Sequence, residues 1–597
     1  MFNDTPRRAH AWHLGACALL AFGLQWPAAS QAKCQLKAME IPVKMVGRRA
    51  IATLTINGTP VPMIVDSGAF YSMLTEGAAQ QLKLTTHFSP LDAPVQGLTG
   101  SIDTRITKVK HLGLSGGDLQ DVEFLVGGNE AGGGGMGLLG RNILALFDAE
   151  YDLAHGMIRI LRTNGECGKT DMAYWAAGDT PVSAVDLLGD GREWWPEIRA
   201  KLMLNGHEVD AVFDTGATTV VSLDAAHSAG VKDADMRRAG QLTGAGSGKA
   251  AAWTAPFDRV QLGGEAVLHN HLEVGDFRFQ GADVLVGIDF FLSHHIYVSN
   301  DQQRMYFTYN GGPVFALNTS AAAAAEAPAS GADDTMTAEE HARRGAASLA
   351  RQDARAALAD LDRACALEPG NGSFFAMRAR VYTALEDADK ALQDLDTALR
   401  LDPGQADSRL ARAGLRHFKD QREAALDDLS TLDKTLPPQS QIRESMAVLY
   451  ETLNRPAEAL AQWNQWIPAH RHDIALENAY NGRCWARAEL GVDLDKALDD
   501  CDEAVDADPK NASYLDSRAW VYLRLGKLPK AKADFDRSLA LRPEGALSLY
   551  GRGLARLRLD EAASGQADLA KARKAQADID AWIKRAGLPQ APDARQP

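Results

Sequence analysis

Residues 211–217 read AVFDTGA, an apolar run that delivers the carboxylate of Asp214 to a Thr-Gly-Ala turn. Residues 63–69 read MIVDSGA and place Asp66 at the same position of a Ser-Gly-Ala turn. An Asn-Gly pair precedes each aspartate, and two aliphatic residues and a glycine follow it, at 57–58 and 138–140 in one copy and at 205–206 and 285–287 in the other. These landmarks occur in the same order and at nearly the same distances, which indicates an internal duplication.

Both copies have the pattern of short β-strands. Residues 50–56 alternate between apolar and polar, the Asn-Gly pair turns the chain, and residues 61–65 return toward the aspartate. The second copy repeats this order over residues 198–213. Short strands and glycine turns without helical periodicity predict a small barrel or sandwich for each copy. We therefore expect two all-β lobes, residues 33–170 and 171–316, that form one pseudo-two-fold bilobal unit.

The chemistry expected of the duplication depends on its two carboxylates. If the lobes pack about a pseudo-two-fold axis, Asp66 and Asp214 meet at that axis. Two carboxylates about 3 Å apart cannot both stay charged, so the pair shares one proton. One member can then deprotonate a water molecule while the other protonates or polarises a carbonyl oxygen, which hydrolyses an amide without a covalent intermediate. The residues expected to fix the carboxylates and let the turns approach closely are Ser67, Gly68, Thr215 and Gly216.

The duplicated turn resembles the catalytic D-[ST]-G-A of the aspartic proteases, and more closely that of their retropepsin-like branch. Residues 138–144, LLGRNIL, are similar to the retropepsin segment that follows the flap. The second copy departs from the pattern, because Ile288-Asp289 replaces Arg-Asn after Gly287. The resemblance implies two catalytic aspartates, a nucleophilic water and β-hairpin flaps over a peptide. Retropepsins usually dimerise, whereas here the second half is expected within the same chain.

Two glycine-containing segments are the best candidates for flaps. They read VQGLTG at residues 95–100 and LTGAGSG at residues 242–248. The residues expected to approach the substrate are Gly97, Leu98, Thr99, Gly244, Ala245 and Gly246. We expect no cofactor and no metal, because the histidine pairs at 269 and 271 and at 294–295 lack the spacing of a carboxylate–histidine helix site and are better read as solvated or hydrogen-bonded.

The N-terminus has the pattern of a secretory signal peptide at residues 1–32. Arginines at 7 and 8 precede a mostly apolar run over 14–24, and residues 30–32 offer a small-x-small cleavage site. A membrane anchor is the alternative, but the run is shorter than the roughly 20 residues that span a bilayer. We expect export to the periplasm or medium, with no stable membrane span after cleavage. Cys34 and Cys167 flank the first lobe and either form a disulfide or remain unrelated thiols.

After residue 316 the composition changes to that of a linker and then of helices. Residues 317–336 are rich in Ala, Ser, Pro and Gly, which predicts a flexible linker. Residues 337–588 are helical and repetitive, and residues 589–597 are expected to be a disordered tail. Prolines recur at intervals of 34, at Pro369, Pro403 and Pro437 and again at Pro509 and Pro543.

This spacing resembles the tetratricopeptide repeat and predicts an all-α solenoid of about seven units. The interval of 72 between Pro437 and Pro509 predicts an insertion in one unit. Cys484 and Cys501 fall on core positions of the repeats, where small apolar thiols are expected rather than a disulfide.

Together these patterns predict an exported aspartic-type endopeptidase that acts on peptide or protein substrates and binds a protein partner through its repeats. A net charge of −15 argues against a nucleic-acid surface. The alternative function is a catalytically inactive peptide-binding scaffold or adaptor built from the same lobes and repeats. A further possibility is that each lobe pairs with its counterpart in another chain.

Overall fold

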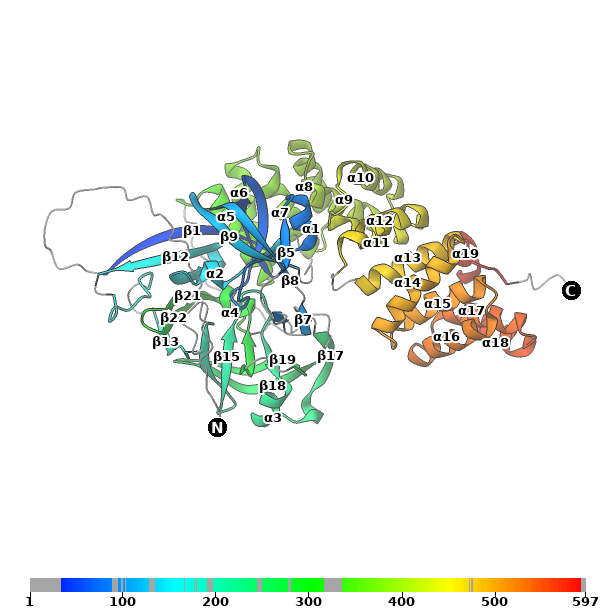
Figure 1. Ribbon diagram of the computed structural model, residues 1–597, viewed down its shortest axis with the longest axis horizontal. Helices are drawn as coiled ribbons and strands as arrows, with labels where there is room; N and C mark the ends of the chain where they lie inside the picture. Colours follow the sequence, from blue (N-terminus) through cyan, green and yellow to red (C-terminus); the bar gives the residue numbers. More distant parts are fainter. Residues whose placement is uncertain are drawn as a thin grey trace, which may run out of the picture.

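The computed structural model describes residues 34–88, 95–97, 100–102, 104–127, 135–165, 167–176, 178, 180–189, 197–242, 244, 250–277, 281–315, 335–471, 473 and 476–591. Two β-rich lobes are followed by a run of helices (Figure 1). The predicted signal peptide and most of the predicted linker and tail lie outside the described residues. Within those residues no helix is both long and apolar enough to cross a bilayer.

The first lobe consists of β1 (Gln35–Val46), β2 (Arg49–Ile56), β3 (Thr59–Val65), β4 (Met73–Leu74), α1 (Glu76–Gln81), β5 (Thr86–Phe88), β6 (Val95–Gly97), β7 (Gly100–Ile102), β8 (Thr104–Leu114), β9 (Gly117–Gly127), β10 (Gly137–Leu139), α2 (Arg141–Leu144), β11 (Asp148–Asp152), η1 (Leu153–His155) and β12 (Met157–Asn164). The second consists of β13 (Ser183–Asp186), β14 (Arg199–Leu204), β15 (His207–Phe213), β16 (Val220–Ser222), α3 (Leu223–Ser228), η2 (Asp233–Asp235), β17 (Arg237–Leu242), β18 (Ala250–Leu262), β19 (Glu265–Gly275), β20 (Val284–Val286), α4 (Ile288–Ser293), β21 (His294–Ser299) and β22 (Arg304–Tyr309).

The duplicated Asn-Gly pairs make the same hairpin turn in both lobes. Asn57 and Asn205 both have φ of 50°, and the following glycines have φ of 82° and 83°. Positive φ at both central residues gives the turn that matches the right-handed twist of a hairpin. Each asparagine side chain also accepts a hydrogen bond from the backbone N–H of a neighbouring strand, from His111 and Arg259 respectively, at 3.1 Å. The expected β2–β3 hairpin and its counterpart β14–β15 are confirmed.

One antiparallel sheet joins the two lobes, in the order β13-β22-β21-β11-β12-β1. Its central pairing connects β11 of the first lobe to β21 of the second, with Ala149 opposite Val298 and Tyr151 opposite Ile296. Glu150 of β11 is fully buried in this sheet, where His295 and Arg159 neutralise it. The lobes therefore pair within one chain, as the bilobal prediction requires, and not with a counterpart in another chain.

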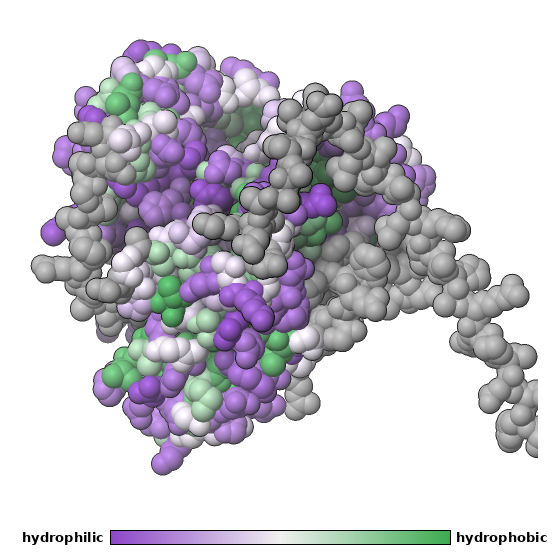
Figure 2. All heavy atoms as spheres, turned by 90° about the vertical axis from the view of Figure 1, so that its left-hand side faces the viewer, coloured by the Kyte–Doolittle hydropathy of each residue, from purple (hydrophilic) through white to green (hydrophobic). Residues whose placement is uncertain are grey.

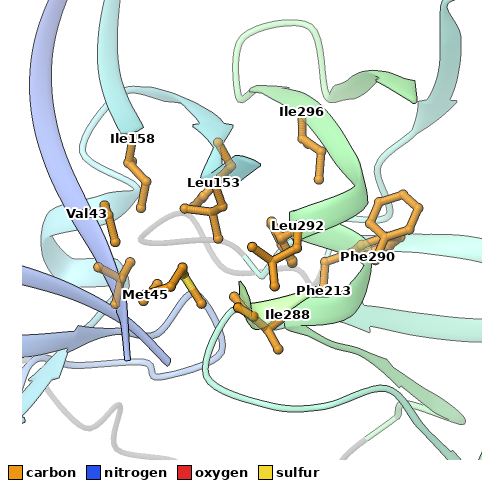
Figure 3. Close-up of a cluster of buried hydrophobic side chains, with 14 of the residues drawn as sticks. Val43, Met45, Leu153, Ile158, Phe213, Ile288, Phe290, Leu292 and Ile296 are labelled. Carbon is orange, nitrogen blue, oxygen red and sulfur yellow. The ribbon is translucent and has the colours of Figure 1, made fainter. Parts of the chain in front are cut away.

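The hydrophobic core is continuous between the lobes. Side chains from β1, η1, β12, β15, α4 and β21 form one buried cluster (Figure 3), in which the labelled residues are Val43, Met45, Leu153, Ile158, Phe213, Ile288, Phe290, Leu292 and Ile296. On the face drawn in Figure 2, by contrast, hydrophilic residues predominate and hydrophobic ones occur in small separate groups. Burial of apolar surface across the lobe boundary thus stabilises their relative position.

The histidine pairs have ordinary environments. Nε2 of His294 lies 3.0 Å from Glu265, and Nε2 of His295 lies 2.9 Å from Glu150. His269 and His271 are exposed. Both pairs are therefore solvated or hydrogen-bonded, as expected from their spacing.

The helical region consists of α5 (Ala338–Ala350), α6 (Ala354–Leu367), α7 (Gly372–Ala384), α8 (Ala388–Leu401), α9 (Ala406–Phe418), α10 (Arg422–Thr435), α11 (Ile442–Thr452), α12 (Pro456–Ala469), α13 (Leu476–Leu490), α14 (Leu494–Ala507), α15 (Ala512–Arg524), α16 (Leu528–Leu541), α17 (Ala546–Arg558), α18 (Ala562–Ala575) and α19 (Ile579–Arg585). The helices α5 to α18 form seven antiparallel pairs, which agrees with the predicted solenoid.

The prediction of one insertion was wrong, because two neighbouring parts of the solenoid share the extra residues. The starts of α9 and α11 are 36 residues apart, as are those of α13 and α15, while α11 and α13 start 34 residues apart. The extra residues thus lengthen the connection before α11 and the α13–α14 unit.

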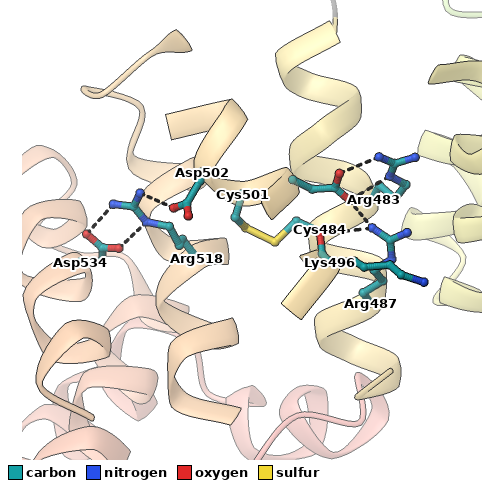
Figure 4. The surroundings of a disulfide bond; sticks show 9 residues. Arg483, Cys484, Arg487, Lys496, Cys501, Asp502, Arg518 and Asp534 are labelled. Carbon is teal, nitrogen blue, oxygen red and sulfur yellow. Dashed lines mark hydrogen bonds and ion pairs between the residues drawn. A yellow bond between two sulfur atoms is a disulfide. The ribbon is translucent and has the colours of Figure 1, made fainter. Parts of the chain in front are cut away.

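Arginines at one position of the repeat connect successive units. Arg518 of α15 binds Asp534 of its own unit and Asp502 of the preceding unit, each 16 residues away (Figure 4). The same two-way pairing recurs at Arg378, Arg412 and Arg552. In the fourth unit Arg443 instead contacts Asp433 and Gln462. A planar guanidinium suits such bidentate bridging.

The first helical unit is docked directly on the lobes. α5 packs on β1 and η1, and its apolar residues Ala338, Ala342 and Ala346 belong to the same core cluster as the lobes. Gly156 has φ of 67°, and a Cβ there would lie 2.6 Å from Cβ of Arg343 on α5. The close approach needs a glycine, and it fixes where the solenoid begins relative to the β-sheet.

Two disulfides are present among the described residues. Cys34 and Cys167 are joined across 133 residues, with their Cα atoms 4.7 Å apart. Cys484 of α13 and Cys501 of α14 are also joined (Figure 4), so the expectation of two free core thiols was wrong. The reason is packing: the paired helices bring the two Cα atoms to 5.5 Å, within the range for a disulfide.

We predict that the longer cross-link contributes more stability. Loop closure gives a stabilisation of about 5 kcal/mol for a loop of 133 residues and about 3 kcal/mol for one of 17. Replacing Cys34 and Cys167 together by Ser should therefore lower the unfolding temperature of the lobes more than replacing Cys484 and Cys501 lowers that of the repeats. Calorimetry measures both transitions, and equal or absent shifts would contradict the prediction.

Candidate active site

Each sequence-predicted aspartate follows the last residue of a buried strand. Asp66 comes after β3, which runs parallel to β10, and its N–H donates to the carbonyl of Leu139 at 3.0 Å. Asp214 comes after β15, which runs parallel to β20, and its N–H donates to the carbonyl of Val286 at 2.8 Å. The aliphatic segments after each copy thus lie beside the aspartate turns and anchor them.

The two turns are bound to each other by their hydroxyl residues. Oγ of Ser67 donates to the carbonyl of Phe213 at 3.1 Å and accepts from the N–H of Thr215 at 3.0 Å. Oγ1 of Thr215 donates to the carbonyl of Val65 at 2.8 Å and accepts from the N–H of Ser67 at 3.0 Å. Both hydroxyls are buried, so each is fully committed to the opposite lobe. These four reciprocal bonds set the distance between the aspartates.

The carboxyl groups of Asp66 and Asp214 meet at this junction and hydrogen-bond to each other. The N–H groups of Gly68 and Gly216 donate to Oδ1 of Asp214, at 3.1 and 2.8 Å. A Cβ added to Gly68 would lie 2.4 Å from the carboxyl carbon of Asp214, and one added to Gly216 would lie 2.6 Å from that of Asp66. The glycines are therefore needed for the approach.

The electrostatics favour one shared proton. Burial raises the pKa of Asp66 well above its usual value, and the neighbouring charge of Asp214 raises it further. Burial also raises the pKa of Asp214, but backbone N–H donors and the cation of Arg141 oppose that shift. Part of each aspartate stays accessible to solvent, as attack by a water molecule requires. The pair can hold one proton and one negative charge, with room for water beside it.

A second pair of polar contacts supports the turns, and the sequence analysis missed it. Ser72 donates from its N–H and its Oγ to Oδ1 of Asn142, at 2.8 and 2.7 Å. In the second lobe Thr219 donates in the same way to Oδ1 of Asp289, at 3.1 and 2.7 Å. Asp289 thus takes the place of an asparagine, and burial raises its pKa. The signal available in the sequence was the equal separation of 70 residues in both pairs.

Arg141 links the lobes beside the dyad. Its side chain is 3% exposed, and its Nη2 lies 3.2 Å from Oε1 of Glu197 in the second lobe. The sequence analysis noted that Ile288 replaces this arginine in the second lobe, and Ile288 is buried in the apolar core there. The site therefore has one nearby cation, on the side of the first lobe.

Hairpins occur at both predicted flap positions. β6 pairs with β7 and places Gly97 opposite Gly100, while β17 pairs with β18 and places Leu242 opposite Ala250. Gly244 follows β17. Leu98, Thr99, Ala245 and Gly246 lie outside the described residues, so contact of these hairpins with a substrate stays a prediction.

Comparison with known proteins agrees with this architecture. Residues 52–143 and residues 200–290 match the family model described as aspartyl protease. Residues 373–405 match the tetratricopeptide repeat model. The chain carries two aspartyl protease-like lobes fused to tetratricopeptide repeats, as the resemblance implied.

Individual relatives cover the chain only in part. Protein SGT1 homolog of Bos taurus is 30% identical over 106 residues, which is 17% of this chain and 31% of that protein. YrrB, described as a repeat protein with an unusual peptide-binding site, is 19% identical, and the match covers 32% of this chain and 97% of YrrB with a TM-score of 0.29. A repeat protein of Parabacteroides merdae is 19% identical, and the match covers 42% of this chain and 98% of that one with a TM-score of 0.31.

We predict that the Thr215 hydroxyl stabilises the joined lobes. Thr215→Val keeps the shape but leaves the N–H of Ser67 and the carbonyl of Val65 without partners, which should cost about 1–3 kcal/mol in the free energy of unfolding. Thr215→Ser keeps the hydroxyl and serves as the matched control, with a loss below about 1 kcal/mol. Urea denaturation measures both, and equal stability of the two variants would refute the role of the hydroxyl.

Proposed function

We propose that this protein is an exported aspartic-type endopeptidase that cleaves peptide bonds with water activated by Asp66 and Asp214. The observation that carries the proposal is the hydrogen-bonded pair of carboxyls, held by reciprocal bonds from Ser67 and Thr215. Perturbed, paired carboxyls in contact with solvent are a typical acid–base device. The protease-like family match of both lobes supports the same activity.

The reaction needs only the shared proton and a water molecule. The ionised carboxylate takes a proton from water as the water oxygen bonds to the carbonyl carbon of the peptide, while the protonated partner gives its proton to the carbonyl oxygen. The resulting diol then collapses: its C–N bond breaks, and the amide nitrogen leaves with a proton delivered through the dyad. The pair returns to its singly protonated state, so no covalent intermediate forms.

Export is the proposed location. The support is the signal-like pattern of residues 1–32 together with the disulfides Cys34–Cys167 and Cys484–Cys501, since disulfides persist mainly in oxidising compartments. We also propose that the repeats bind a protein partner, as stacked helical repeats commonly do.

We predict that each aspartate is required for cleavage. Asp66→Asn or Asp214→Asn removes the shared proton and charge, and the rate of peptide cleavage should fall at least about 10²-fold. Asp210→Asn, on the same strand as Asp214 but paired with Lys201, is the control and should keep its activity. Substrate binding with no turnover in the wild type would favour the scaffold alternative, and full activity of either dyad variant would remove the shared dyad.

The pH profile of cleavage should be bell-shaped. At low pH a second proton neutralises the base, and at high pH the pair loses its shared proton, so the rate falls on both sides. Because burial raises the pKa of Asp66, the alkaline limb should lie well above the usual aspartate pKa of about 4.

Arg141 offers a test of which charge controls the acid limb. Its cation lowers the pKa of Asp214, so Arg141→Gln should raise that pKa and move the acid limb to higher pH. Glu197 keeps Arg199 as a partner at 3.3 Å in this variant. The profile of kcat/KM against pH measures the shift, and a shift to lower pH would contradict the assignment.

A further inference from the structure

The C-terminal helix folds back across the first helices of four repeat units. Asp580 accepts a hydrogen bond from Tyr550 of α17 at 3.1 Å, and the ring of Trp582 stacks 6.4 Å from that of Trp485 on α13. The carbonyl of Arg585 accepts from Asn454, just after α11, at 3.2 Å. These contacts cross from the seventh unit to the fourth, and Figure 1 shows α19 beside α13 and α15.

The segment after α19 returns along the same face. Gly587 has φ of 68°, which turns the chain, and its carbonyl accepts a hydrogen bond from Arg524 at the end of α15. The N–H of Ala591 then donates to the hydroxyl of Tyr550 at 3.0 Å. Residues 579–591, here called the C-terminal segment, therefore contact the first helix, or the turn directly after it, in units four to seven.

The contact has the chemistry of an amphipathic helix in a groove. Ile579, Ile583 and Ala586 are spaced as one helical stripe and are at most 3% exposed, as is Leu588 beyond them. They belong to one apolar cluster with Leu523, Tyr550 and Leu554 of α15 and α17. The opposite face, which includes Asp580 and Lys584, is exposed. Anchors at i, i+4 and i+7 are the usual signature of a helix bound in a groove.

The C-terminal segment depends on this groove for its structure. α19 has seven residues, and a helix of that length is unstable alone in water. Its hold on the groove comes from the apolar stripe, one indole stack and a few hydrogen bonds, reinforced by covalent attachment, which gives a local concentration in the millimolar range. A free helix with the same pattern would compete for the same contacts.

We propose that the groove over α11, α13, α15 and α17 binds an amphipathic helix of a partner protein, and that the C-terminal segment is its intramolecular occupant. The inference rests on the proposed partner-binding role of the repeats and names the partner's chemistry: an aromatic residue that stacks on Trp485, directly followed by an aliphatic one for the apolar cluster. The partner displaces the C-terminal segment, so that segment sets the affinity.

The test uses the segment itself as the probe. A fluorescent synthetic peptide of residues 577–591 is titrated into the full chain and into a chain that ends at residue 576. The truncated chain should bind the peptide at least tenfold more tightly than the full chain, because its groove lacks the tethered competitor. A peptide with W582A and I583D should not bind, and a peptide with K584A, altered on the exposed face, should bind like the original.

A second variant guards against loss of folding on truncation. The full chain with Ile583→Asp keeps its length but loses the central anchor, and it should also bind the peptide more tightly than the wild type does. Trp485→Ala in the truncated chain should weaken binding, while circular dichroism verifies that the helices persist. Equal affinity of the full and truncated chains, or no binding by any folded variant, would overturn the proposal. Peptide cleavage by the dyad is measured separately, so failure of one proposal is distinguishable from failure of the other.

Discussion

The arrangement of this protein depends on a reciprocal exchange of hydrogen bonds between two short turns. Ser67 and Thr215 each donate to, and accept from, the backbone of the opposite lobe, and both hydroxyls are buried. A buried hydroxyl that loses its partner costs free energy, so neither turn can move without the other. This constraint brings two acidic side chains into contact that would otherwise repel each other.

The lobes supply the stiffness that this contact needs. The sheet that continues from β11 into β21, and the apolar core behind it, fix the lobes at a distance from the dyad itself. Behind each turn a Ser or Thr bonds to Asn142 or Asp289, so the two halves use the same support with different side chains. The cost of pairing two carboxyls is thus carried by many ordinary interactions, and the proton they share is a consequence of that rigidity.

The repeats form a continuation of the lobes. α5 is packed on β1 and η1, so the orientation of the first unit is set by the protease-like lobes, and arginine–aspartate bridges pass that orientation along most of the solenoid. Arg443 departs from this pattern in the fourth unit, which is also where the C-terminal segment begins to cover the groove. A partner bound there would be held at a defined position relative to the dyad.

The sequence by itself determined the local features. An apolar strand that ends in Asp-Thr-Gly or Asp-Ser-Gly can be read from adjacent residues, as can Asn-Gly hairpins and a repeat of 34 residues, because each depends on neighbours along the chain. Only the tertiary structure decided which distant groups meet. The bond between Ser72 and Asn142, the disulfide between Cys484 and Cys501, and the return of α19 to the fourth unit all join segments whose contact depends on packing angles. No local pattern encodes those angles, since they result from the sum of many weak apolar contacts.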